Sequence, residues 1–194
     1  MPESALPPSL AELGPPRLLS ADEVLRMVAA GLLVDERVEL LDGVLYAMSP
    51  QGPAHSASSV WLHQRLAARY GESFSVYDHS TFRLSDVSLP EPDLAVVRGR
   101  PLDFYARHVR PADIVLLVEI SMTSQRRDRA KAALYAAGGV PVYWRVDLPT
   151  RRVELHTQPA PGGYAQLASY GADEPVPLPE LGTELAFAEL FRAG

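Results

Sequence analysis

Two carboxylates in the middle of the chain have the type and placement of ligands for a divalent cation. Glu119 interrupts the apolar run DIVLLVEIS, and Asp93 opens a second apolar stretch, DLAVV, directly after Pro92. If the two stretches are antiparallel strands of one sheet, both carboxylates lie at the same edge. Two like charges about 4 Å apart repel by roughly 4 kcal/mol at a protein-surface dielectric, so this pair requires a counter-ion.

The identity of the counter-ion follows from the available ligands. The chain has no cysteine, which excludes disulfides and thiolate metal sites. Hard carboxylate oxygens favour Mg²⁺ or Mn²⁺, which take one or two carboxylates and complete their shell with water and substrate phosphate. The sequence therefore predicts a Mg²⁺ or Mn²⁺ site at Asp93 and Glu119. A buried ion pair around Glu119 is an equally open alternative.

Lys131 is the third candidate, because it is the only lysine in a chain with seventeen arginines. It lies in the helix expected after Glu119, on the flank of an apolar stripe, from which its long stem can reach the strand end. A compact ammonium there could position an attacking water or stabilise a charged transition state. The alternative is a helix-surface lysine without a role.

The surrounding pattern predicts the elements that must position these residues. Helices are expected over 20–31, where Ser20 and Glu23 have capping-box spacing, and over about 55–70 and 124–137. A hairpin is expected around Asp42-Gly43. Further strands are expected over 73–84, 93–97, 113–121, 140–147, 152–158 and 163–169, with a loop over 101–113 and a short terminal segment over 184–191.

This order of elements favours an α/β fold with a mixed sheet, helices packed against it and hairpins on its flanks. Residues 1–19, which are rich in proline, are expected to form an extended arm, and 20–194 a single domain. Tyr143 and Trp144 lie in an alternating strand and are expected in the core.

The composition also limits the partners and the compartment. The net charge of −6 provides no overall basic surface for a phosphate backbone, so any nucleic-acid contact must be local. Arg126 and Arg127 are candidate phosphate contacts, although a solvated helix face is at least as good an explanation. The N-terminus has no signal-peptide pattern and no segment approaches the length of a membrane span, so we expect a soluble cytoplasmic protein without membrane contact.

Several segments in combination resemble a known family. PEPDLAVV, LLVEIS and DRAKAALYAAGGVPVYWRVD, with VELLDGVLYAMSP and AHSASSVWLHQRL upstream, are similar to the Uma-type putative endonucleases of the PD-(D/E)XK nuclease superfamily. The resemblance covers about residues 20–185. It implies a restriction-endonuclease-like core that cleaves DNA with Mg²⁺, in which Asp93 and Glu119 are the metal ligands. By analogy, such nucleases often act as homodimers.

The resemblance also suggests further site residues. The superfamily's usual lysine two positions after the second acid is here Ser121, and Lys131 matches the position from which Uma-type members are thought to supply it. Asp128 also matches a family position, and the resemblance implies that it supports the residues of the metal site without binding the metal itself. The chain departs from the family at Val142, where an acidic residue often stands.

Two upstream polar residues match family positions as well. Glu39 is either a third acid of the cleft or a surface partner for an arginine, and His55 is either a proton shuttle or phosphate contact, or an ordinary histidine at a helix end. His79, His108 and His156 have no zinc-site spacing and are expected to be structural.

The sequence therefore predicts a divalent-metal-dependent endonuclease that hydrolyses DNA without a covalent enzyme intermediate. Its catalytic residues would be Asp93, Glu119 and Lys131, and Asp93→Asn, Glu119→Gln or Lys131→Ala is expected to abolish cleavage while the fold stays intact. Two alternatives remain open. One is a non-catalytic DNA-binding or interaction module with a residual metal site, and the other is a structural domain with a buried Glu119–Lys131 ion pair.

Overall fold

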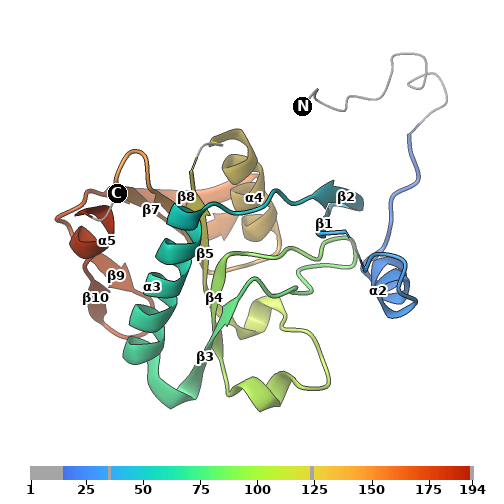
Figure 1. Cartoon of the computed structure of the whole chain (residues 1–194), viewed down its shortest axis with the longest axis horizontal. Coiled ribbons are helices and arrows are strands. Elements are labelled where there is room, and N and C mark those ends of the chain that lie inside the picture. The colour runs from blue at the N-terminus through green and yellow to red at the C-terminus, as the bar shows by residue number, and fades with distance from the viewer. Residues whose placement is uncertain (1–14, 35, 123–124, 193–194) are drawn as a thin grey trace.

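The computed structural model describes residues 15–34, 36–122 and 125–192, and the side chains of 125–128 lie outside this description. The centre of the molecule is a six-stranded mixed sheet (Figure 1). Its strands are, in order, β3 (Phe74–Asp78), β4 (Leu94–Arg98), β5 (Ile114–Ser121), β6 (Val142–Asp147), β7 (Arg152–Ala160) and β8 (Gly163–Tyr170). The mixed α/β architecture predicted from the sequence is therefore confirmed.

Strand β5 is central because its apolar sequence suits burial on both faces, and every one of its residues is buried. It pairs antiparallel with β4 and parallel with β6, and the parallel step is made possible by helix α4 (Gln125–Ala137), which crosses between the two strands. The remaining neighbours in the sheet are antiparallel.

Different elements pack against the two faces of the sheet. Helix α3 (Pro53–Tyr70) packs on one face with the small hairpin β9 (Val176–Leu178) and β10 (Thr183–Leu185) and helix α5 (Ala188–Arg192), as Figure 1 shows. Trp144 belongs to this core. The other core contains Tyr135 of α4, Tyr143 of β6 and the loop residues Phe82 and Val109. Tyr143 and Trp144 are both fully buried, as expected.

A smaller unit precedes the sheet and packs along the loop that leads into β4. Helix α2 (Ala21–Ala29) has the predicted capping box, in which Ser20 Oγ accepts from the Glu23 amide at 3.3 Å and Glu23 Oε2 accepts from the Ser20 amide at 2.9 Å. Strands β1 (Val38–Leu41) and β2 (Val44–Ala47) form the predicted hairpin. Its turn residues Asp42 and Gly43 have φ of 47° and 81°, the left-handed conformation that such a turn requires.

Some boundaries differ from the prediction. The strand expected over 73–84 ends at Asp78, because the next residue, His79, has a φ of 42° and turns the backbone out of the ladder. The segment 101–113 contains the two 3₁₀ turns η2 (Pro101–Phe104) and η3 (Pro111–Asp113). A third, η1 (Gly71–Ser73), joins α3 to β3. Residues 1–14 of the predicted arm lie outside the described residues. Within the described ranges, no helix is long and apolar enough to cross a membrane.

The contact between the end of α4 and the loop after β3 predicts a stability effect. A Cβ added at Gly138 would stand 2.6 Å from Cγ of Leu84, which is itself buried. Gly138→Ala should therefore lower the free energy of unfolding by about 1–3 kcal/mol, the usual cost of overpacking a core. Urea denaturation would measure it. Gly52→Ala is the control, since a Cβ there meets nothing within 4 Å, and an equal loss in both variants would contradict the packing argument.

Candidate active site

The pairing of β4 with β5 brings the two predicted carboxylates together. Leu94 is the Cα partner of Val118, so the antiparallel register continues to Asp93 opposite Glu119. Their relative exposures of 6% and 8% are low for carboxylates and leave each at the rim of the sheet rather than sealed inside it. The predicted common edge is thus present.

Lys131 joins two acids from distant parts of the chain. Its Nζ donates to Glu119 Oε1 at 2.9 Å and lies 3.1 Å from Glu39 Oε2. The lysine is buried, and so is Glu39, which sits on β1 and also accepts a long 3.5 Å hydrogen bond from the Glu91 amide. Glu39 is therefore buried beside Lys131 and does not lie on the surface, while its role as a third acid of the site stays a prediction.

Tyr135 completes the surroundings of Glu119 from the next turn of α4. Its hydroxyl donates to Glu119 Oε1 at 2.6 Å, the same oxygen that accepts from Lys131. Among the described residues, both donors to Glu119 share Oε1, and none contacts Oε2. Sequence reasoning missed Tyr135, although its spacing of four residues from Lys131 places both on one face of the helix.

Burial and charge act in opposite directions on this cluster. Burial and the charge of Asp93 raise the pKa of Glu119 to about 7, against the opposing effects of Lys131 and Tyr135. Burial tends to lower the pKa of Lys131, but the carboxylates of Glu119 and Glu39 hold that pKa above its usual value. Lys131 therefore remains an ammonium. The cluster has an excess of acid, which a divalent cation would neutralise.

Asp93 is held in place by hydrogen bonds to both of its oxygens. Oδ2 accepts from the Ile120 amide at 2.7 Å and lies 3.0 Å from His55 Nε2, while Oδ1 accepts from Gln51 Nε2 at 3.1 Å. The Ile120 contact ties the carboxylate to the strand that carries Glu119. His79 adds a second imidazole, with its Nδ1 3.6 Å from Asp93 Oδ1.

His55 is the imidazole that contacts Asp93 from α3, and its role as a proton shuttle or phosphate contact stays a prediction. It lies in the first turn of α3 and is buried. Burial tends to lower its pKa, but the hydrogen bond to Asp93 and the charges of Asp93 and Glu119 raise it overall, which favours the imidazolium form. A charged imidazole beside the carboxylate fixes the carboxylate's orientation.

Gln51 and His79 were not identified from the sequence as site residues. Both stand in loops, where no periodicity indicates the direction of a side chain. His79 was expected to be structural, yet it lies beside Asp93 because the left-handed backbone at this residue turns the chain at the end of β3.

The remaining candidates have different outcomes. Ser121 is buried at the end of β5, and its carbonyl accepts from the Leu148 amide at 3.1 Å, so it lies at the strand end beyond Glu119. Asp128, Arg126 and Arg127 belong to α4, but their side chains lie outside the described residues. Their predicted supporting and phosphate-binding roles stay predictions.

The donor set fits a hard divalent cation. Asp93 and Glu119 provide two carboxylates on neighbouring strand ends, and Mg²⁺ is commonly bound through one or two carboxylates with water and phosphate as further ligands. In the described part of the chain, no group of three or more His, Asp or Glu side chains is arranged to hold a metal by itself. The described carboxylates therefore do not form a closed structural metal site.

Comparisons with known proteins agree with this architecture. The family model Uma2, described as putative restriction endonuclease, matches residues 22–188. A crystal structure of a putative nuclease belonging to DUF820 from Anabaena variabilis ATCC 29413 has a similar fold, with a TM-score of 0.69 and 18% sequence identity over 91% of this chain and 98% of that chain. No curated protein matches this chain significantly.

Proposed function

This chain belongs to the Uma2 family, and from that membership and the site geometry we propose that it hydrolyses phosphodiester bonds of DNA with a divalent metal ion. One observation carries the proposal: Asp93 and Glu119 lie opposite each other at the ends of β4 and β5, with the ammonium of Lys131 2.9 Å from Glu119. Acids and a lysine at adjoining strand and helix positions are what hydrolysis at a phosphate requires.

Asp93 and Glu119 would hold Mg²⁺ or Mn²⁺. When bound, such an ion lowers the pKa of a water ligand and neutralises charge on the phosphate. The protein's own contribution is to fix the two carboxylates. Ile120, His55 and Gln51 orient Asp93 through its two oxygens, and Tyr135 and Lys131 orient Glu119 through one.

Lys131 would position the nucleophile. An ammonium has three N–H groups, and among the described residues two of them are taken by Glu119 and Glu39. The third can hold the attacking water beside the phosphate. The water oxygen then forms a bond to phosphorus as the P–O ester bond breaks, and the leaving oxygen gains a proton. The reaction includes no covalent enzyme intermediate, and two copies of the chain could cut both strands of a duplex.

Incubation of the protein with supercoiled plasmid and with single-stranded DNA tests the proposal. In Mg²⁺ or Mn²⁺, nicks should accumulate, and EDTA should stop them. Asp93→Asn should reduce cleavage to the EDTA level, because the amide keeps the size of the side chain but loses the charge that binds the cation. Gel analysis of the products would measure both effects.

The same experiment separates the alternatives. Wild-type cleavage by Asp93→Asn would rule out the proposed site. If neither protein cuts, calorimetric titration with Mg²⁺ decides the matter: binding that Asp93→Asn loses would favour a non-catalytic module with a metal site. Absence of binding would leave the buried ion pair of Glu119 and Lys131 as a structural feature.

A further inference from the structure

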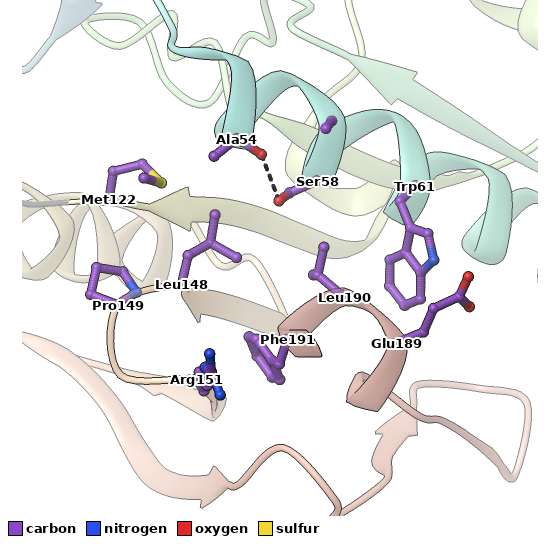
Figure 2. A pocket seen from close by; sticks show the side chains of 11 residues that line it. Ala54, Ser58, Trp61, Met122, Leu148, Pro149, Arg151, Glu189, Leu190 and Phe191 are labelled. Carbon is purple, nitrogen blue, oxygen red and sulfur yellow. Dashed lines mark hydrogen bonds between the residues drawn. The ribbon is translucent and has the colours of Figure 1, made fainter. Parts of the chain in front are cut away.

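The side of the sheet that Glu119 faces carries a second group of buried charges. An open pocket of about 440 Å³, between α3, α5 and the turn after β6, lies on the other side of the sheet (Figure 2). Glu119 points away from this pocket, because its carboxylate contacts Lys131 and Tyr135 of α4. The groups that can act on Glu119 are therefore those beneath α4, on β6 and β7.

Arg145 lies beside Glu119 in the sheet. The two residues are Cα partners in the parallel pairing of β5 with β6. Tyr143 packs against Tyr135 of α4, with ring centroids 5.4 Å apart, and side chains two residues apart in a strand point to the same face. Arg145 is thus on the α4 side, as Glu119 is. Neighbouring strands are only about 4.8 Å apart, so an arginine side chain is long enough to reach Glu119.

The guanidinium of Arg145 is instead held by two other acids. Its Nη2 and Nε donate to the two oxygens of Glu154 at 2.7 Å and 2.9 Å, and its Nη1 donates to Asp147 Oδ2 at 2.8 Å. The paired contact with Glu154 is the strongest geometry that an arginine and a carboxylate can adopt. We call Arg145, Glu154 and Asp147 the arginine clamp.

The sheet fixes the two acids of the clamp. Glu154 is the Cα partner of Arg145 in the pairing of β6 with β7. Asp147 ends β6, and its Oδ1 accepts from the Thr150 amide at 3.0 Å in the turn that follows. The hydrogen bonds from Arg145 lower the pKa of Glu154 against the effect of burial, so this carboxylate is ionised at neutral pH. A small recess of about 110 Å³ adjoins Arg145 and Glu154, which leaves the guanidinium room to move.

We infer that Glu154 and Asp147 hold Arg145 away from Glu119 and thereby keep the second oxygen of Glu119 available to the cation. The inference rests on the proposed function and adds Glu154 to it as a positioning residue. Lys131 and Tyr135 share Glu119 Oε1, and among the described residues none contacts Oε2. An arginine at Oε2 would give Glu119 a base on each oxygen, and the cation would have to displace the guanidinium to bind.

The clamp depends mainly on Glu154, which accepts two of the three hydrogen bonds that it contains. A guanidinium released from Glu154 stays beneath α4, where Arg145 and Glu119 are both buried. Buried charges are poorly solvated and pair with the nearest opposite charge that they can reach. Glu119 is such a charge, because it is the neighbour of Arg145 on the strand opposite β7.

The crystal structure of Glu154→Met in EDTA tests the clamp directly. Methionine removes both acceptor oxygens and keeps much of the side-chain volume, so the Arg145 guanidinium should lie within hydrogen-bond distance of Glu119 Oε2. Calorimetric titration with Mn²⁺ should show binding about ten- to a hundredfold weaker than in the wild type, the usual effect of losing a group that supports a metal ligand. Saturating Mn²⁺ should restore nicking, because the ion then displaces the guanidinium.

Three further variants separate this effect from damage to the sheet. Glu154→Met combined with Arg145→Met should return the Mn²⁺ affinity to within about threefold of the wild type, because no guanidinium competes. Glu154→Gln keeps one acceptor oxygen and should show a smaller loss in the same direction. Glu189→Met is the matched control, since it removes the acid of an exposed pair with Arg65 and changes the net charge equally, and it should leave the affinity unchanged. Urea denaturation verifies that each variant is folded at the titration temperature.

Each result has a definite meaning for the clamp. A guanidinium that stays away from Glu119 in Glu154→Met, or an unchanged Mn²⁺ affinity in both Glu154 variants, would overturn the inference. Weaker binding that Arg145→Met does not reverse would also overturn it, because the loss would then come from the pairing of β6 with β7. If the wild type binds no Mn²⁺, the proposed function fails at its metal site, whereas the position of Arg145 in the crystal structure still decides whether the clamp holds it away from Glu119.

Discussion

Replacement of Lys131 by methionine is expected to lower the free energy of unfolding by about 3–5 kcal/mol, measured by urea denaturation in EDTA. Lys131 is buried between Glu119 and Glu39, at 2.9 Å and 3.1 Å from their oxygens. Methionine preserves much of the side-chain volume but removes the only cation that the described residues place between these two acids. Two buried carboxylates would then lose the ammonium that lies beside both of them.

The control for this variant is Arg129→Met, which removes a positive charge from an exposed position on the same helix. It should change the stability by no more than about 0.5 kcal/mol. Addition of Glu119→Gln to Lys131→Met should restore part of the lost stability, because one of the uncompensated charges disappears. Equal stability of Lys131→Met and Arg129→Met would show that the ammonium does not hold the cluster together.

This result would change the interpretation of any loss of cleavage at Lys131. From the sequence, its replacement is expected to abolish cleavage and to leave the fold intact. The structure instead places it at the junction of β1, β5 and α4. The cleavage activity of a Lys131 variant must therefore be compared with that of the wild type without denaturant, at a temperature where both proteins are folded.

In contrast to Lys131→Met, Glu119→Gln is expected to leave the stability of the protein almost unchanged. Glutamine keeps an oxygen that can accept from Lys131 and Tyr135, and it removes a buried charge whose pKa is raised to about 7. The free energy of unfolding should stay within about 1 kcal/mol of the wild type. Metal-dependent nicking should fall by more than about a hundredfold, because changes that only support a metal ligand already cost 10–100-fold.

Parallel melting curves and single-turnover nicking assays would measure both quantities on the same preparation. Loss of stability without loss of nicking would indicate a structural ion pair and remove Glu119 from the site. Loss of nicking at unchanged stability would separate the catalytic role of the carboxylate from its place in the cluster.

The relation of Asp93 to Glu119 was predictable because it depends on local patterns. Each residue is tied to an apolar strand, and an antiparallel register between two such strands is sufficient to bring the carboxylates together. The location of Lys131 followed in the same way from the helical period. Its second partner, Glu39, was only suggested by the family resemblance, since the docking of the β1–β2 hairpin on the sheet has no signal in the spacing.

The positions of Gln51 and His79 and the existence of the pocket were not predictable. Gln51 and His79 reach Asp93 through loop conformations, and His79 needs a left-handed backbone that no periodicity indicates. The pocket is formed where α3 meets the turn after β6 and helix α5, which are far apart in the sequence. Such tertiary contacts depend on how helices and strands pack against one another, which the sequence of a single helix or strand does not show.

The order of strands in the central sheet also has a consequence for how the protein folds. From β3 to β8 every strand is hydrogen-bonded to the next one along the chain, so the sheet can grow through successive pairings of neighbours. Topologies rich in such near-neighbour contacts fold rapidly, because little loop entropy is lost before each contact forms. The contact between Glu39 and Lys131 is an exception, since it spans almost half of the chain. We therefore expect the sheet to form early in folding and the cluster of Glu39, Glu119 and Lys131 to close late, when the N-terminal hairpin docks.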